Sequence, residues 1–343
     1  MKGIILHGGH GTRLRPLTHT GPKQLLPIAN KPMSEYCLEA IRDCNITEIA
    51  IIIGGVGSEK VREYYGDGEK FGVNITYVKQ DEPRGIAHAI NLCKNFIQDE
   101  KFLVFLGDNI IQKPISEIKE KFENSTFDAT LLLCEVDNPS RFGIADLKEG
   151  KITKIMEKPD NPPTNFAVTG IYLLTPEIFE IIDNLEPSWR NEFEITDALQ
   201  ILLEKNDNIS YDVITDYWKD TGTPEDIINA NAQILENISK DEFVSGEKTE
   251  IDSDCSIIMP STIGKNCKIK KNVRIGPYAS IGDNTIISSN VKIENSIIMS
   301  DCKIEDGLKI NNSIISSNCH LEGNNRDDSE KLFLLGEGTR ISL

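Results

Sequence analysis

The sequence has no long hydrophobic run, since no apolar stretch approaches the roughly 18 residues of a membrane-spanning helix. Its start, Met1-Lys2 followed by four apolar-type residues, is too short for a signal peptide. Positive charge is also scarce, because 37 Lys and Arg stand against 54 Asp and Glu and leave a formal net charge of −17. We therefore expect a soluble, cytoplasmic protein that binds neither nucleic acid nor membranes.

Paired cysteines are missing as well. The eight cysteines include no C-x-x-C pair, which speaks against a zinc site or a redox motif. With 343 residues the chain is long enough for about two domains, each with its own hydrophobic core. We predict a first domain over residues 1–239, a polar linker over 240–250 and a second domain over 251–343.

A glycine loop follows the first apolar run. Residues 3–6 are rich in isoleucine, as in a short strand, and lead directly into the loop at residues 8–13. Successive backbone N–H groups in such a loop can point at one cluster of anionic oxygens, and the Arg13 guanidinium adds donors that suit phosphate. The P-loop needs Lys and then Ser or Thr after its last glycine, and the dinucleotide fingerprint needs a glycine in place of Leu14, so neither motif matches. A connecting turn stays the alternative for the glycines alone, but Arg13 and Lys23 together favour a phosphate site.

Strands and helices are expected to alternate in short units over the first domain. The expected strands are residues 3–6, 49–53, 75–79, 102–106 and 209–214. The expected helices are 34–45, with Ser34 as its N-terminal cap, 58–65, 86–96 and 224–236. This order predicts an α/β fold, an open and mostly parallel sheet with helices on both faces and ligands at the carboxyl ends of the strands. Gln80 and Gly85 follow the third strand, where an amide and a backbone N–H could pair with the edge of a base, and Asp108 follows the fourth. From the sequence alone, Gln80 could also be a surface residue, and Asp108 a helix cap instead of a metal ligand.

Several blocks occur together in a characteristic order. GGxGTRLxPLT is followed by PKQLLPI and by Lys31-Pro32-Met33. Later blocks are Arg141-Phe142-Gly143-Ile144, Met156-Glu157-Lys158-Pro159, the segment 168–172, the segment 190–197 and the segment 217–223. The combination resembles the sugar-1-phosphate nucleotidylyltransferases, most closely the glucose-1-phosphate thymidylyltransferases, over residues 1–239. The resemblance implies a Rossmann-like nucleotide-diphospho-sugar transferase fold, transfer of a nucleotidyl group from a nucleoside triphosphate (dTTP favoured) to glucose 1-phosphate, and Mg²⁺ as cofactor.

The resemblance also implies roles for individual residues. The catalytic residues would be Arg13, Lys23 and Asp108. The nucleotide-binding residues would be Leu6, Gly8, Gly9, Gly11, Thr12, Arg13, Gln80, Gly85 and Asp108. The residues that bind the sugar phosphate would be Asn109, Gly143, Glu157, Lys158, Val168, Tyr172 and Arg190. Asp108 and Asp220 would hold the metal, although no spacing rule links two residues so far apart in the sequence.

The second domain is an internal repeat. Isoleucine recurs every six residues from Ile251 to Ile293. The step shortens once to five residues, at Ile298, and then returns to six at Ile304 and Ile310. Small residues stand two positions before most of them, among them Cys255, Cys267 and Cys302, with Cys319 expected in the same role further on. This is the hexapeptide repeat of a left-handed parallel β-helix, in which isoleucine fills the interior and the small residue fits a tight corner. We expect about four coils, with the tail at 327–343 packed back on them or on a neighbouring subunit.

Many proteins with this repeat are acetyltransferases, so acyl transfer is an alternative for the second domain. His320 is its only histidine and lies near its end, which favours an assembly or regulatory module and a homo-oligomer. For the first domain, a uridylyl- or guanylyl-transferring enzyme and a catalytically silent subunit are also compatible with the sequence. Five positions depart from the common family pattern and bear on the choice of base and sugar, not on the class of enzyme: His7, His10, His88, Phe142 and Asn191.

Overall fold

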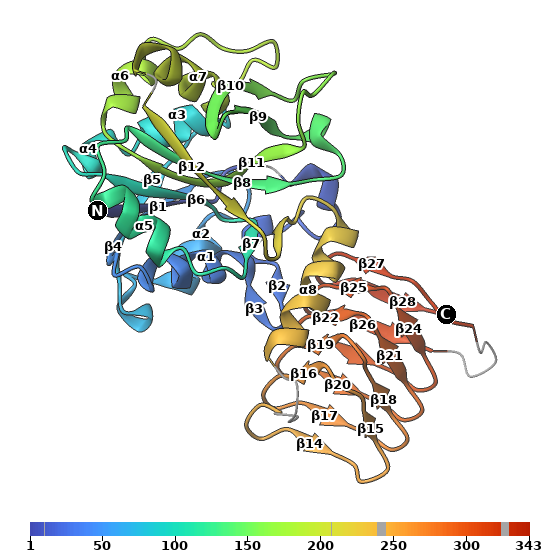
Figure 1. Ribbon diagram of the computed structural model, residues 1–343. Helices are drawn as coiled ribbons and strands as arrows, with labels where there is room; N and C mark the ends of the chain where they lie inside the picture. The colour runs from blue at the N-terminus through green and yellow to red at the C-terminus, as the bar shows by residue number, and fades with distance from the viewer. Residues whose placement is uncertain (10, 207, 239–244, 324–328) are drawn as a thin grey trace. The chain divides into compact units, whose positions relative to one another are not determined.

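The computed structural model describes residues 1–9, 11–206, 208–238, 245–323 and 329–343 (Figure 1). These residues form two compact units, one made of residues 1–9 and 34–220 and the other of residues 11–33 with the described part of 221–343. The predicted domain boundaries at 239 and 251 stay predictions, and His10 and residues 240–244 of the predicted linker lie outside the described residues. Among the described residues, no helix is long and apolar enough to span a bilayer.

The first unit is built on a nine-stranded sheet. Its order is β10-β9-β11-β6-β1-β4-β5, with β8 paired to β11 and β12 paired to β8. The strands are β1 (Lys2–Leu6), β4 (Glu48–Ile53), β5 (Asn74–Lys79), β6 (Phe102–Leu106), β8 (Ala129–Glu135), β9 (Gly143–Lys148), β10 (Lys151–Glu157), β11 (Phe166–Leu174) and β12 (Ile209–Ile214). The half made of β5, β4, β1 and β6 is parallel, and β11 runs antiparallel to its neighbours β6, β8 and β9. The predicted open, mostly parallel α/β sheet is confirmed.

Helices cover both faces of this sheet (Figure 1). One face carries α1 (Met33–Arg42), α2 (Glu59–Tyr65) and α5 (Ser116–Glu123), and the other carries α3 (Ile86–Asn91), α6 (Glu177–Asp183) and α7 (Ile195–Asn206). Strand β4 is buried on both sides, which is why its sequence is a continuous run of isoleucine and alanine after Glu48.

Two local predictions in this unit were wrong. The helix expected at residues 86–96 is divided into α3 and the short α4 (Lys94–Ile97), because Cys93 between them leaves the helical conformation. Ser34 was expected to cap the first helix, but α1 begins one residue earlier. The Ser34 hydroxyl is instead hydrogen-bonded to the Tyr65 hydroxyl at 2.6 Å, inside the core.

The second unit contains a segment from near the N-terminus, here called the arm (residues 11–33). It includes the 3-10 helices η1 (Thr12–Leu14) and η2 (Lys23–Leu25) and the strands β2 (Pro27–Ile28) and β3 (Lys31–Pro32). Helix α8 (Pro224–Ile238) carries the buried Asn231, whose Oδ1 accepts hydrogen bonds from Ala29 N at 2.9 Å and from Ser280 Oγ at 2.7 Å. The arm, α8 and the repeat region are therefore joined through one side chain.

The repeat region forms three parallel sheets that run along a left-handed β-helix. The first sheet is β14-β17-β20-β23-β26-β28, the second is β15-β18-β21-β24, and the third is β16-β19-β22-β25-β27. These strands are β14 (Glu250–Ile251), β15 (Ser256–Ile257), β16 (Ser261–Ile263), β17 (Lys268–Ile269), β18 (Arg274–Ile275), β19 (Ala279–Ile281), β20 (Ile286–Ile287), β21 (Lys292–Glu294), β22 (Ile297–Ile298), β23 (Lys303–Ile304), β24 (Lys309–Asn311), β25 (Ile314–Ile315), β26 (His320–Glu322), β27 (Leu334–Leu335) and β28 (Arg340–Ser342). The repeated isoleucines from Ile263 onward and the corner residues Cys267, Cys302 and Cys319 are buried in its interior, as predicted. Cys255, in the first coil, is only partly buried.

The end of the chain differs from the expectation. Instead of packing back on the β-helix, the described part of the tail extends it: β27 pairs with β25, β28 pairs with β26, and Phe333 is buried in the interior. The β-helix continues beyond the four coils expected, because Leu335 and Ile341 pair with the interior residues Ile315 and Leu321 although their spacing in the sequence is irregular. Residues 327 and 328 of the predicted tail lie outside the described residues.

Candidate active site

The carboxyl edge of the parallel strands brings three predicted segments of the first unit together. Leu6 at the end of β1 faces Leu106 at the end of β6, and Gly107 N donates to Leu6 O at 3.0 Å. Gly8 and Gly9 therefore begin beside the turn that carries Asp108. Gln80 follows β5 at the same edge, and a Cβ on Gly8 would lie 3.1 Å from Gln80 Oε1.

The two predicted metal ligands are linked by a short sheet that the sequence did not suggest. Strands β7 (Asn109–Ile111) and β13 (Trp218–Asp220) pair antiparallel, with Asp220 opposite Asn109. Facing residues of such a pair lie about 4.5 to 5.5 Å apart at Cα. The pairing therefore brings Asp220 next to the residue that follows Asp108.

Asn109 orients the Asp108 carboxylate. It is buried, its Nδ2 donates to Asp108 Oδ1 at 3.0 Å, and its Oδ1 accepts the Trp218 Nε1–H at 2.8 Å. Gly170 in β11 makes room for it, because a Cβ there would lie 2.8 Å from Asn109 Nδ2 and 2.6 Å from the Leu106 side chain. The Asn109 amide, which the family resemblance assigns to the sugar phosphate, is thus engaged within the protein.

Apart from Asn109, the residues predicted for the sugar phosphate gather around Glu157 at the end of β10. Thr196 Oγ1 donates to Glu157 Oε2 at 2.9 Å, and Lys158 Nζ lies 3.1 Å from Glu157 Oε1. A Cβ on Gly143 would meet the Thr196 methyl group at 2.6 Å and Glu157 Oε2 at 3.4 Å, with Val168 at 3.8 Å. Tyr172 is buried nearby, and its pKa is raised by burial and then by the charges of Glu157 and Asp108.

Arg190 contacts glutamates of its own unit. Its Nη1 lies 3.5 Å from Glu157 and 3.1 Å from Glu194, and its Nη2 lies 3.1 Å from Glu192. Burial and the neighbouring Glu157 charge raise the pKa of the Glu194 carboxyl, so Arg190 serves to balance negative charge here. The predicted contact of Arg190 with a phosphate stays a prediction.

The loop at Gln80–Ile86 is held by the segment before α7. Phe193 N donates to Arg84 O at 2.7 Å, and Ala87 N donates to Phe193 O at 3.1 Å. Gly85 has φ +105° and lies against this segment, so that a Cβ would fall 2.5 Å from Phe193 O. Only glycine fits this conformation and this spacing. The block at 190–197 therefore shapes the loop that was predicted to meet the base.

The arm of the second unit contains four of the predicted site residues, Gly11, Thr12, Arg13 and Lys23. Gly11 has φ +57°, and its carbonyl oxygen accepts the Thr18 hydroxyl at 2.8 Å. A Cβ on Gly11 would lie 3.5 Å from Lys23 Cβ, so Lys23 starts beside the loop. Thr12 and Arg13 are exposed in η1. The arm thus carries both predicted catalytic cations close to one turn.

His7, at the end of β1, is an unusual core residue. It is 1 % exposed, and neither ring nitrogen has a hydrogen-bond partner among the described residues. Burial lowers the pKa of its imidazole to about 3, although the Asp108 charge acts in the opposite direction. His7 is therefore neutral and packs edge-on against Tyr65 at 6.0 Å between ring centroids.

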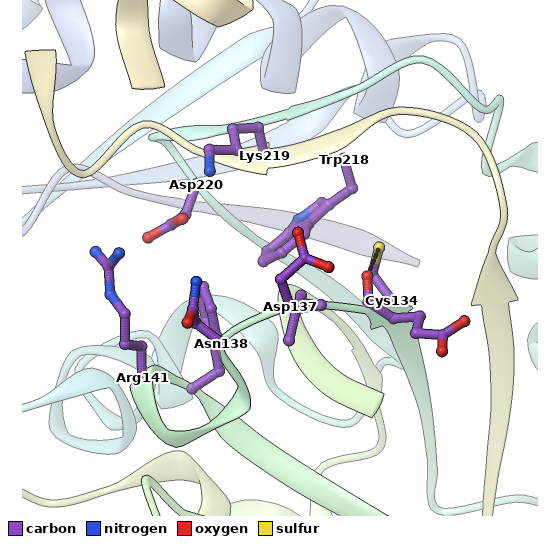
Figure 2. A pocket seen from close by; sticks show the side chains of 10 residues that line it. Cys134, Asp137, Asn138, Arg141, Trp218, Lys219 and Asp220 are labelled. Atoms are coloured by element: carbon purple, nitrogen blue, oxygen red, sulfur yellow. Dashed lines mark hydrogen bonds between the residues drawn. The ribbon is translucent and has the colours of Figure 1, made fainter. Parts of the chain in front are cut away.

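A pocket of about 230 Å³ opens beside Asp220. It is lined by Cys134, Glu135, Val136, Asp137, Asn138, Arg141, Phe142, Trp218, Lys219 and Asp220. Figure 2 shows the Arg141 guanidinium and the Asp220 carboxylate facing each other across it. Of its lining, only Asp220 was among the predicted site residues. Arg141 and Lys219 were not among the predicted site residues, because nothing in the sequence says that residues 134–142 lie beside 218–220.

The carboxylates of Asp108 and Asp220 suit a magnesium ion. Mg²⁺ prefers hard oxygen ligands and commonly binds one or two carboxylates together with substrate phosphates and water. Among the described residues there is no group of three or more His, Cys, Asp or Glu side chains that could hold a metal by themselves. A two-carboxylate site completed by a substrate fits this arrangement.

The chain is similar to known proteins over most of its length. The nucleotidyl transferase family model matches residues 2–237, and the model of the GMPPB C-terminal domain matches residues 257–342. The chain is 43 % identical over 318 residues to the low-salt glycan biosynthesis nucleotidyltransferase Agl11 of Haloferax volcanii, with 89 % of each chain covered. It is 39 % identical over 319 residues to a glucose-1-phosphate thymidylyltransferase of Streptomyces antibioticus, covering 89 % of this chain and 88 % of that protein.

A solved structure of a UDP-glucose pyrophosphorylase complexed with UDP-glucose superposes with a TM-score of 0.62 at 28 % identity, covering 69 % of this chain and 98 % of the other. The family model alone spans more than half of the sequence. The chain accordingly belongs to the sugar-1-phosphate nucleotidylyltransferase family.

Proposed function

We propose that this nucleotidylyltransferase uses dTTP and glucose 1-phosphate and forms dTDP-glucose and pyrophosphate. The observation that supports the catalytic part is the pairing of β7 with β13, in which Asp220 lies opposite Asn109, the residue that follows Asp108. The choice of thymidine is supported by the KQLLPI and Glu-Ile-Thr-Asp blocks and by the likeness to a thymidylyltransferase.

Charge repulsion is the main barrier that the site must lower. The two substrates together carry about six negative charges, so a sugar phosphate oxygen approaches the α-phosphorus against Coulomb repulsion. Gly8, Gly9 and Gly11 would offer backbone N–H groups to the triphosphate, Arg13 would hold its outer phosphates, and Lys23 would neutralise the reacting ones. A Mg²⁺ held by Asp108 and Asp220 would supply further positive charge at the α-phosphate.

The displacement needs no protein nucleophile. The sugar phosphate oxygen forms a bond to the α-phosphorus while the bond to the leaving pyrophosphate breaks, and positioning with charge neutralisation supplies the catalysis. Glu157, oriented by Thr196, would accept hydrogen bonds from sugar hydroxyls, and Gly143 lets the backbone approach the ring. Lys158 would neutralise the phosphate of the sugar.

Pyrophosphate release tests the proposal across dTTP, UTP, GTP and CTP, each with glucose 1-phosphate and with other sugar 1-phosphates. We expect the highest kcat/KM for dTTP with glucose 1-phosphate. A clear preference for UTP would keep the class of reaction and overturn the base. Release of no pyrophosphate from any pair would favour a catalytically silent subunit, although Arg13, Lys23, Asp108 and Asp220 are all present.

Substitutions in the site test the roles separately. Asp108→Asn or Asp220→Asn should remove most turnover in Mg²⁺ and leave the fold intact, and near wild-type rates would show that the carboxylates are misassigned. Arg13→Ala should lower the rate by orders of magnitude, and a loss confined to sugar binding would move Arg13 to another role.

The repeat domain invites one further assay. His320 lies on β26 with Nε2 3.1 Å from Glu305 Oε1, and a histidine paired with a carboxylate could act as a base. Consumption of acetyl-CoA with an amino-sugar phosphate would support a bifunctional enzyme. Its absence would favour an assembly role, for which sedimentation would reveal the expected homo-oligomer.

A further inference from the structure

The amide of Gln80 is held in one orientation by its neighbours. Gln80 is 6 % exposed, and its Nε2 lies 3.0 Å from His88 Nδ1 and 3.4 Å from the Gly85 carbonyl oxygen. A carbonyl oxygen only accepts hydrogen bonds, so the NH₂ end of the amide must face Gly85. Because an amide nitrogen only donates, His88 Nδ1 must be the acceptor, and the imidazole carries its proton on Nε2.

This orientation turns the other end of the amide towards the glycine loop. The Oε1 atom of Gln80 lies 3.1 Å from the point where a Cβ on Gly8 would be. An oxygen there can accept the imide N–H that thymine and uracil carry, whereas cytosine has an acceptor nitrogen at that position. We infer that His88 is a positioning residue, which fixes the Gln80 amide so that the site selects bases with an imide N–H. The inference rests on the proposed function, in which Gln80 contacts the base.

The surroundings of His88 keep its imidazole able to accept a hydrogen bond. The ring is half-buried on α3 and stacks on Phe193, with 6.3 Å between ring centroids. Burial lowers the pKa of His88, the Arg84 charge acts in the same direction, and Glu82 acts against it. These are the two charged groups that act on the ring among the described residues.

Protonation would reverse the arrangement. Both nitrogens of an imidazolium donate, so Nδ1 could no longer accept from Gln80. The amide would have to turn, which places its oxygen against the Gly85 carbonyl oxygen and its NH₂ group beside Gly8. The site would then present a donor where the imide N–H also donates, and selection for thymine and uracil would be lost.

Kinetics with dTTP, UTP and CTP test the role of His88. His88→Leu should raise KM for dTTP and UTP about tenfold with little change in kcat, and should narrow the preference over CTP by the same factor. His88→Gln should keep KM and the preference over CTP close to the wild-type values, because the glutamine oxygen can accept a hydrogen bond from the Gln80 amide. Asn91→Leu is the matched control on the same helix, since Asn91 bonds to Asp183 and should change neither quantity.

Two further measurements separate the possible failures. The wild-type preference for dTTP over CTP should decline as the pH falls below 6.5, the ordinary pKa of histidine, and the preference of His88→Gln should not. If Gln80→Leu keeps the wild-type preference, the base site of the proposed function is misplaced. If Gln80→Leu loses the preference while His88→Leu keeps it, only the role of His88 is overturned. Should His88→Leu fail to fold, the comparison of pH profiles decides.

Discussion

Replacing Asn109 by leucine tests the carboxylate pair through a residue without charge. Asn109 is 2 % exposed and makes two side-chain hydrogen bonds, to Asp108 at 3.0 Å and from Trp218 at 2.8 Å. Leucine has a similar volume and makes neither bond. The bond to the ionised Asp108 contributes about 2 kcal/mol and the neutral bond about 1 kcal/mol, so the free energy of unfolding should fall by about 3 kcal/mol.

Turnover should fall as well, because Asp108 loses the donor that orients its carboxylate. A loss of about 2 kcal/mol in that orientation corresponds to a rate lower by about thirtyfold. Thermal unfolding measures the stability, and pyrophosphate release measures the rate. Trp218→Phe is the matched control, since it removes only the neutral bond and should cost about 1 to 2 kcal/mol with a small change in rate. Wild-type turnover in Asn109→Leu would refute the reasoning, and an effect on KM for the sugar phosphate alone would return Asn109 to its sequence-based role.

Three other changes have expected outcomes. The pKa of His7 is about 3 in the fold and 6.5 in the unfolded chain, so between these pH values the unfolded state binds more protons. As the pH falls through this range, the free energy of unfolding of the wild type should decrease by up to about 1.4 kcal/mol per pH unit relative to that of His7→Leu. Urea unfolding measures both, and parallel pH curves for the two proteins would contradict this. Ile287→Ala should destabilise the β-helix by about 2 to 5 kcal/mol, because Ile287 is fully buried. Ile286→Ala, at the outward-facing neighbour, should lower the stability measured by thermal unfolding much less, and equal losses of stability would show that the interior is misassigned. Gly170→Ala should lower both stability and kcat, because its Cβ would fall 2.6 Å from Leu106 and 2.8 Å from Asn109, and an unchanged rate would show that β11 can shift without cost.

Hydrophobic patterning predicted the elements of the fold well where one period dominates. The buried run in β4 and the six-residue isoleucine step could each be assigned without tertiary information, because continuous apolar strands and hexapeptide coils are distinctive patterns. Ser34 shows the limit of such patterns. A serine before an apolar run suits a cap, but its hydroxyl is used by Tyr65, which lies on another helix.

The candidate site shows a similar division. Gly85 and Asp108 could be proposed as site residues because they follow strands in a parallel sheet, where ligands are expected. The residues that contact the site residues from other elements could not be predicted. The pairing of Asp220 with Asn109 depends on two three-residue strands, and the support of Glu157 by Thr196 joins β10 to α7. Strands of that length carry no periodicity, so only the three-dimensional structure shows them.

The arm gives the β-helix a structural role that its repeats alone do not suggest. Asn30 Nδ2 donates to the Ile281 carbonyl oxygen at 2.8 Å, and a Cβ on Gly336 would lie 3.0 Å from the carbonyl oxygen of Pro16. Two different coils therefore contact the segment that carries Arg13 and Lys23. Because a β-helix is a stack of hydrogen-bonded coils with little freedom to bend, it can hold such a segment in place more firmly than a surface loop holds itself. A substitution that destabilises the coils should consequently disturb the positions of Arg13 and Lys23 through the arm, even though no residue of the repeats takes part in the proposed displacement.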